Sequence, residues 1–271
     1  MKMTTQAPAR KPRAPRREFA ELVRETPPSE TSLPLTHMTD GYVFRSIMEG
    51  MELEPAPCTV FDDEPLLYFF YGRPAYRAAA QAQSNGLDAY APICLVMKPD
   101  AVPPRRIFPF DSGAFHNHLL ADFTHHKMVK EDFELDCMAD MPGRLINLFW
   151  SSGEAYFNNR DTSNYVPEAM AFEAKSYQEL IRFKGKSGFD DRASTIEIQA
   201  AEAVALPENT LAVILPYDFA KGPILARIEA MDALALPYDH VSRGTPGENV
   251  ALIYSIVRDL LSGQRGKVRY W

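Results

Sequence analysis

The stretch from Asp63 to Arg77, DEPLLYFFYGRPAYR, constrains the fold most strongly. Its apolar part is short and aromatic, which favours a buried strand, and Gly72 ends that strand. Pro74 suits the first position of a helix, because its missing N–H would have no helical partner there in any case. The pattern therefore places Arg73 at the end of a strand where a helix begins. A guanidinium beside helix N–H groups is well placed to bind a phosphate or pyrophosphate.

Apolar runs on both sides of this unit predict further strands and helices. A strand over residues 33–39 leads to Asp40, which can cap a helix over residues 42–49 that Gly50 ends. Other apolar runs predict buried strands at 91–98, 105–110, 211–215 and 234–238. The first two of these are expected to pair as a hairpin-like unit. Helical periodicity or composition predicts helices at 75–84, 167–182, 222–233 and 247–261. These elements together predict an α+β fold.

Charge divides the chain into a basic tail and an acidic body. Residues 1–17 hold six basic side chains and no acidic one, whereas the remaining 23 basic and 36 acidic residues give the body a formal charge of −13. The Pro, Ser and Thr residues of 26–31 are typical of a linker. We expect residues 1–31 to be a disordered basic tail and linker, and residues 32–271 to be one domain. The tail is interpreted as a solvated arm or as an aid to nucleic-acid binding.

Neither a membrane anchor nor a secretion signal is indicated. No stretch approaches the roughly 18 to 20 apolar residues that a membrane-spanning helix needs, and the N-terminus lacks the apolar segment of a secretory signal. Cys58, Cys94 and Cys137 are scattered, without the Cys-x-x-Cys spacing of a zinc or redox site. We expect reduced cysteines, no membrane contact and a cytoplasmic location.

Two polar residues draw attention because the pattern places them on strands. His37 falls at the end of the 33–39 strand, where a structural and a functional histidine are both open interpretations. Glu197 falls within a strand over residues 194–199, on the same face as Thr195 and Gln199. A glutamate there indicates either a solvated edge or a functional site.

Four of the six histidines lie close together in sequence, as His116, His118, His125 and His126. Their spacing matches no zinc motif, and no metal ligand is assigned. A polar loop, a substrate contact and a metal site are the open interpretations of this segment.

Three short segments resemble members of the ADP-ribosyltransferase superfamily, and more closely its DNA ADP-ribosyltransferase toxins. They are LTHMTDGYVFRSIMEG (35–50), EPLLYFFYGRPAYR (64–77) and DRASTIEIQ (191–199). The shared feature is their order: a strand-end histidine, a strand and turn bearing Tyr and Arg, and a late glutamate on a strand. The resemblance implies a split antiparallel β-sandwich with flanking helices, and NAD bound in its cleft as co-substrate.

The resemblance also implies a role for each matching residue. Glu197 would be the catalytic carboxylate, because a nearby anion stabilises the oxocarbenium-like cation formed when the nicotinamide–ribose bond breaks. Arg73, also placed among the catalytic residues, would contact the NAD phosphates or the acceptor. His37 would hydrogen-bond a ribose of NAD. Tyr71, or alternatively Tyr68, would stack on the nicotinamide. The expected NAD-binding residues are His37, Thr39, Tyr68, Tyr71 and Arg73. We expect His37, Tyr71, Arg73 and Glu197 to line one cleft.

The expected activity is transfer of ADP-ribose from NAD to a macromolecule, as in a toxin or defence effector. The resemblance favours nucleic acid over protein as the acceptor and leaves room for an antitoxin partner. Thr195, two residues before Glu197, argues against the transferases that modify arginine, which carry Glu or Gln there. The alternatives are NAD hydrolysis or protein modification by the same fold, and a catalytically inactive nucleotide-binding module.

Overall fold

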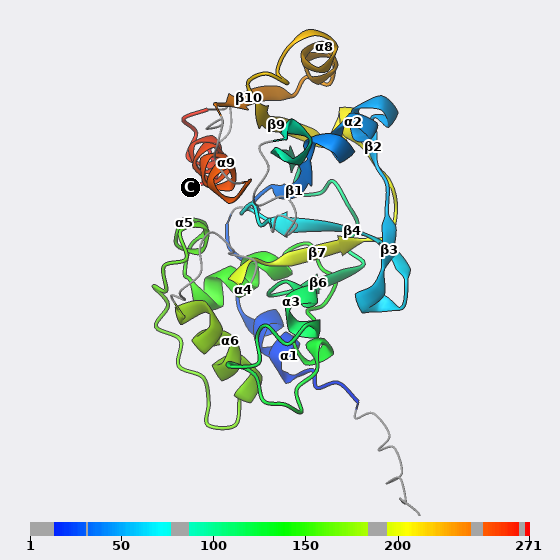
Figure 1. Ribbon diagram of the computed structural model, residues 1–271. Helices are drawn as coiled ribbons and strands as arrows, with labels where there is room; N and C mark the ends of the chain where they lie inside the picture. The colour runs from blue at the N-terminus through cyan, green and yellow to red at the C-terminus, as the bar shows by residue number, and fades with distance from the viewer. Residues whose placement is uncertain (1–13, 31, 77–86, 184–193, 240–245, 266–268) are drawn as a thin grey trace, which may run out of the picture.

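The computed structural model describes residues 14–30, 32–76, 87–183, 194–239, 246–265 and 269–271 (Figure 1). The strands are β1 (Leu35–Asp40), β2 (Glu52–Leu53), β3 (Ala56–Cys58), β4 (Glu64–Tyr71), β5 (Pro92–Met97), β6 (Arg106–Phe108), β7 (Glu197–Ala200), β8 (Val204–Ala205), β9 (Thr210–Pro216) and β10 (Leu234–Tyr238). The α-helices are α1 (Glu18–Glu25), α2 (Gly41–Gly50), α3 (Ser112–His116), α4 (Met141–Phe149), α5 (Gly153–Phe157), α6 (Phe172–Arg182), α7 (Leu206–Asn209), α8 (Gly222–Ala230) and α9 (Pro246–Leu261).

The fold is α+β, as predicted, and is built on a mostly antiparallel sheet. The strand order is β10-β9-β5-β1-β4-β7-β6, and β3 pairs with β4 outside this path. Strands β9 and β10 run parallel, whereas β1, β4, β5, β6 and β7 pair antiparallel with their neighbours. In the part of the chain that the structure describes, no helix is both long and apolar enough to cross a membrane.

The junction between β1 and β4 is short, and this determines where the site lies. All six residues of β1 pair with β5, but only Leu35 and Thr36 pair with β4. Beyond that point the two strands diverge, as Figure 1 shows for β1 in blue and β4 in cyan. Along the same edge of β4, residues 64–66 pair with β3, so Leu67 to Phe69 lie between the two ladders. The sheet is therefore open between β1 and β4.

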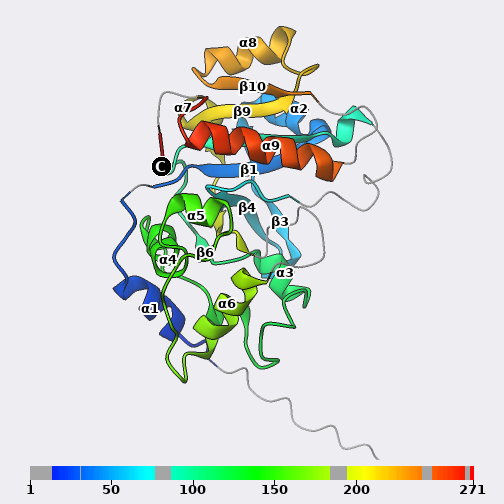
Figure 2. The same cartoon turned by 90° about the vertical axis from the view of Figure 1, so that its left-hand side faces the viewer.

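Two apolar clusters hold the helices against the sheet. The smaller one packs α9 against β5 and β9, through Val257 and its neighbours on the helix and Val96 and Ile214 on the strands. Figure 2 shows α9 lying across this part of the sheet. The larger cluster includes Phe69 and Tyr71 of β4 together with residues of α1, α4 and α6. Alternate residues of β4 therefore point to opposite faces, and Tyr68 and Phe70 are turned away from this core.

Helix α1 belongs to the folded unit, so the boundary expected near Ser32 is too late in the sequence. Phe19 and Val23 are buried in the larger cluster. The guanidinium of Arg144 on α4 donates to the carbonyl oxygens of Arg24 and Thr26, at 2.8 and 2.7 Å. Residues 18–24 predict one or two helical turns, but the burial of this helix depends on partners more than 100 residues away. Residues 1–13 of the expected tail lie outside the described residues.

Most of the predicted elements are present, with three corrections. Strand β6 pairs with β7, and β5 pairs with β1 and β9, so the expected hairpin of residues 91–98 and 105–110 is wrong. Asp40 caps α2 as predicted, but the left-handed residue after that helix is Met51, with φ 58°, rather than Gly50. Pro74 does not begin a helix within residues 74–76; the rest of the predicted 75–84 helix lies outside the described residues.

Candidate active site between β1, β4 and β7

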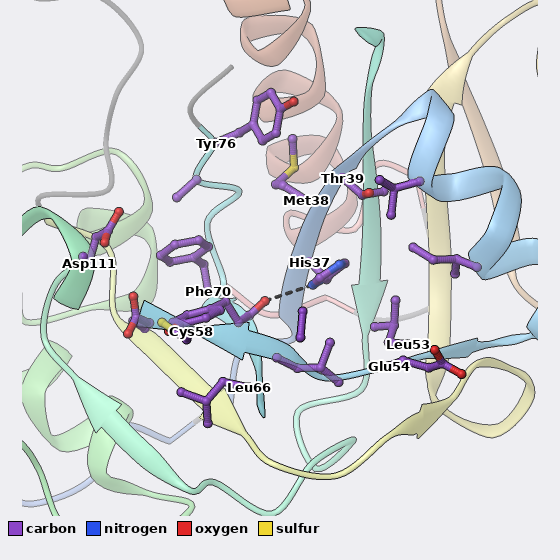
Figure 3. Close-up of a pocket in the computed structure, with 18 of the residues that line it drawn as sticks. His37, Met38, Thr39, Leu53, Glu54, Cys58, Leu66, Phe70, Tyr76 and Asp111 are labelled. Atoms are coloured by element: carbon purple, nitrogen blue, oxygen red, sulfur yellow. Dashed lines mark hydrogen bonds between the residues drawn. The ribbon is translucent and has the colours of Figure 1, made fainter. Parts of the chain in front are cut away.

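A pocket of about 900 Å³ opens where β1 and β4 diverge. This volume is within the range of ligand-binding pockets, roughly 300–1,000 Å³. Strand β1 contributes His37, Met38 and Thr39, and Figure 3 shows these three side chains along one side, with Asp111 on the opposite side. Among the residues that the structure describes, the lining contains four carboxylates: Glu52, Glu54, Asp111 and Glu197. This described part of the lining is acidic.

Glu197 is the most deeply buried carboxylate of this lining, with 1% of its surface exposed. Its Oε1 accepts two hydrogen bonds of 2.7 Å, from the Ser112 hydroxyl and from the Gln199 amide. Its Oε2 accepts a longer bond, 3.2 Å, from the Ser112 backbone N–H. Burial raises the pKa of Glu197 to about 7, and the neighbouring Asp111 charge acts in the same direction. The interpretation of Glu197 as part of a solvated edge is therefore wrong, because β7 lies between β4 and β6.

His37 reaches across the gap between β1 and β4. Its Nδ1 lies 2.9 Å from the Tyr68 carbonyl oxygen, the contact drawn as a dashed line in Figure 3. A carbonyl oxygen only accepts, so Nδ1 carries the proton and Nε2 of the neutral ring is an acceptor. Burial lowers the pKa of His37, and the hydrogen bond to Tyr68 acts in the opposite direction. His37 is thus a neutral, oriented acceptor at the pocket wall.

Tyr68 lines the same pocket from β4. Its hydroxyl donates to the Cys58 sulfur at 2.7 Å, and Cys58 itself lines the pocket. Burial raises the pKa of Tyr68, with further contributions from the hydrogen bond to Cys58 and the charge of Glu197. Tyr68 therefore stays a neutral hydroxyl, and its ring and Phe70 supply aromatic surface beside Glu197.

Tyr71 does not line the pocket, so the expectation that it stacks on a ligand is wrong for this geometry. Its side chain is buried in the larger apolar cluster, and its hydroxyl accepts the Leu33 backbone N–H at 2.9 Å. The cause is strand alternation: Tyr68 and Phe70 face the pocket, and Tyr71 faces the opposite side. Of the two tyrosines proposed for stacking, the structure brings Tyr68 to Glu197.

Arg73 also lies outside the pocket lining and is fully buried, with 0% of its surface exposed. Its guanidinium donates to the Tyr156 carbonyl and to the hydroxyls of Ser194 and Thr195, each at 2.8 Å, and lies 4.9 Å from the centre of the Tyr156 ring. These bonds tie the end of β4 to α5 and to the segment that enters β7. The expected phosphate contact is wrong for this geometry, because the donors are directed at protein oxygens.

The four clustered histidines do not take part in the pocket either. His116, His118, His125 and His126 lie in α3 and the turns that follow it, and none of them lines the pocket. Within the described ranges, no group of three or more His, Cys, Asp or Glu side chains is arranged to hold a metal ion.

Sequence reasoning missed several residues of the site. Asp111 and Ser112 gave no sign of a site in the sequence, yet Asp111 caps α3 and Ser112 donates to Glu197. Cys58 gave no signal at all. Gln199 was placed correctly on the face of Glu197 by the period of two, but strand alternation alone does not reveal a hydrogen bond between them.

The comparisons with known proteins give no further direction: no model of a known protein family matches this chain, and no curated protein matches it.

Proposed function

We propose that this protein is an NAD-dependent ADP-ribosyltransferase whose active site is the pocket between β1, β4 and β7. One observation carries the proposal: His37, Tyr68 and Glu197, separated by up to 160 positions, come from three consecutive strands of the sheet and line one pocket. This is the order in which the superfamily presents its histidine, tyrosine and glutamate. The divergence of β1 and β4 supports, in turn, the split β-sandwich that such a site requires.

The reaction needs an anion beside a sugar carbon that becomes cationic. When the nicotinamide–ribose bond breaks, its electron pair stays on the nicotinamide nitrogen, which becomes neutral, and the ribose C1′ becomes oxocarbenium-like. Ionised Glu197 stabilises this cation, and it accepts the proton that the acceptor loses when its own bond to C1′ forms. The donors on Oε1 hold the carboxylate still, which leaves Oε2, with one long hydrogen bond, as the oxygen that faces the reaction.

The charges of the lining favour one end of NAD over the other. The pyridinium ring of NAD is cationic and aromatic, so it suits a pocket with four carboxylates, Tyr68 and Phe70. His37 Nε2 can accept from a ribose hydroxyl. The diphosphate is repelled by the same carboxylates, so it lies toward the mouth of the pocket. A nucleic-acid acceptor, the favoured class, therefore presents a base to Glu197 and keeps its own phosphates outside.

The test is incubation of the protein with NAD labelled in the adenylate phosphate, together with separate pools of DNA, RNA and protein. The proposal predicts release of nicotinamide and transfer of label to one pool, with DNA or RNA labelled in preference to protein. His37→Ala should lower the rate, and Cys137→Ala is the control, because Cys137 is exposed and does not line the pocket.

Each of the other outcomes would indicate a different function for the pocket. Nicotinamide release without labelling of any pool would indicate NAD hydrolysis by the same site. Labelled protein and unlabelled nucleic acid would indicate protein modification. Failure to bind NAD at all would refute the proposal and leave a binding module for another ligand.

A further inference from the structure

Gln199 lies beside Glu197 on β7 and is fully buried, with 0% of its surface exposed. Its amide nitrogen donates to Glu197 Oε1 at 2.7 Å and to the Ser112 hydroxyl at 3.2 Å. The Ser112 hydroxyl in turn donates to Glu197 Oε1. Three side chains thus form a closed ring of hydrogen bonds around one carboxylate oxygen. Gln199 does not line the pocket, so it acts on Glu197 and not on a ligand.

A second contact fixes which way the Gln199 amide points. Nη1 of Arg106, on β6, donates to the Gln199 Oε1 at 3.4 Å. Arg106 is itself held by Glu64 at 2.5 Å and lies 4.6 Å from the centre of the Phe61 ring. With the amide reversed, its oxygen would face the Glu197 carboxylate and its NH₂ group would face the Arg106 guanidinium. Both contacts would then be repulsive, so Arg106 selects the orientation that donates to Glu197.

We propose that Gln199 is a positioning residue for the reaction of Glu197, and that Arg106 on the neighbouring strand orients Gln199. This inference rests on the proposed function, because it assigns Glu197 the chemistry described above. Gln199 binds the oxygen that faces away from the reaction, so Oε2 is left to the substrate. Its donated hydrogen bond also favours the ionised form of the carboxylate, which is the form that the reaction uses.

The test is Gln199→Met, which keeps the length of the side chain and removes the amide. The first measurement is the titration of the Glu197 carboxyl by NMR, in protein labelled at the glutamate carboxyl carbon and with the signal assigned by its loss in Glu197→Gln. The groups that face Glu197 are Asp111 before α3 and Tyr68 on β4, with Arg106 behind Gln199. All three are retained in the variant, so the titration midpoint should move upward by about one pH unit because of the lost donor alone.

The second measurement is nicotinamide release as a function of pH. At pH 7 kcat should fall about fivefold, since fewer molecules carry the ionised carboxylate, and it should recover above the new midpoint with little change in KM for NAD. A merely structural role would lower the rate at every pH. Gln178→Met is the matched control: Gln178 is also buried and donates to a carbonyl, that of Tyr165, but it lies on α6 outside the site.

The two neighbouring arginines provide a second test that does not depend on the folding of Gln199→Met. Arg105 and Arg106 both pair with Glu64, but the contact with the Gln199 side-chain amide comes from Arg106, whereas Arg105 donates only its backbone N–H to the Gln199 carbonyl, a bond that Arg105→Met keeps. Arg106→Met should move the Glu197 midpoint upward, and Arg105→Met should move it less. An unmoved midpoint in Gln199→Met, or equal shifts in the two arginine variants, would overturn the positioning role. If the midpoint moves as expected but wild-type protein releases no nicotinamide, the contact is upheld and the proposed function alone fails.

Discussion

Glu197→Gln should make the protein more stable at alkaline pH while removing the proposed activity. The pKa of Glu197 is about 7 in the folded protein, against 4.5 for the ordinary glutamate. Each pKa unit corresponds to about 1.4 kcal/mol, so ionised Glu197 costs the fold about 3 kcal/mol above pH 7. The neutral amide avoids this cost, and the raised pKa already includes the favourable hydrogen bonds from Ser112 and Gln199 to the charged form. The expected net gain is therefore about 3 kcal/mol at pH 8.

The gain should depend on pH in a definite direction. Because the pKa of Glu197 is raised in the folded state, the favourable contribution of the protonated carboxyl is complete below pH 4.5 and is lost as the pH rises through about 7. Wild type and Glu197→Gln should therefore differ little near pH 4.5. The free energy of unfolding of the variant should exceed that of wild type increasingly between pH 5 and pH 8.

Urea unfolding at a series of pH values measures this difference, and Glu64→Gln is the control of opposite sign. The hydrogen bonds from Arg105 and Arg106 lower the pKa of Glu64, so its ionised form stabilises the fold above pH 4.5. Glu64→Gln should accordingly be less stable than wild type at pH 8 and similar to it in acid. Two results would show that burial does not disfavour the Glu197 charge. One is a Glu197→Gln variant that is less stable than wild type at pH 8, and the other is a difference in the free energy of unfolding that is the same at every pH.

Three further outcomes follow from the structure. Arg73→Ala should lower the free energy of unfolding by roughly 3–5 kcal/mol, because it leaves buried oxygens without their donor. A variant that is as stable as wild type in urea but binds NAD more weakly would instead show that Arg73 contacts the ligand. NAD should slow alkylation of Cys58, which lines the pocket, and not of Cys137, as followed by mass spectrometry; equal rates with and without NAD would place the ligand elsewhere. Removal of residues 1–13 should leave the melting temperature unchanged, whereas removal of residues 1–26 should abolish the cooperative transition because it deletes Phe19 and Val23; similar melting of the two truncated proteins would be evidence against this account of α1.

The strands and helices were largely predictable because their apolar residues recur with the period of the element. Residues 211–215 are a continuous apolar run, and β9 is buried on both faces as such a run requires. Which strands pair was less predictable. Proximity in sequence suggested that residues 91–98 pair with 105–110, but the second of these segments forms β6 and pairs with β7. Residues 18–24 predicted only one or two helical turns, and the docking of α1 depends on contacts with α4 that no local pattern reports.

Of the residues predicted for the candidate site, His37 and Glu197 line the pocket and Arg73 does not. Glu197 was identifiable because glutamate is disfavoured in strands, so its presence there indicates either a solvated face or a functional site. Arg73 sits at the expected strand end, yet the direction of its guanidinium depends on Ser194 and Thr195, more than 120 positions away. An arginine at such a position binds either a ligand or the protein itself, and only the tertiary contacts decide between them.

The most direct test of the central claim compares wild type and Glu197→Gln for two quantities, NAD affinity by calorimetry and the rate of nicotinamide release. Loss of a preorganised charge at the reacting centre is worth on the order of 3–4 kcal/mol, so release should fall about 100-fold to 1000-fold. Affinity for NAD should fall much less than the rate, because the amide keeps the shape of the side chain and Glu52, Glu54 and Asp111 still line the pocket. Release at the wild-type rate by Glu197→Gln would contradict the account, since the carboxylate would then have no part in the chemistry.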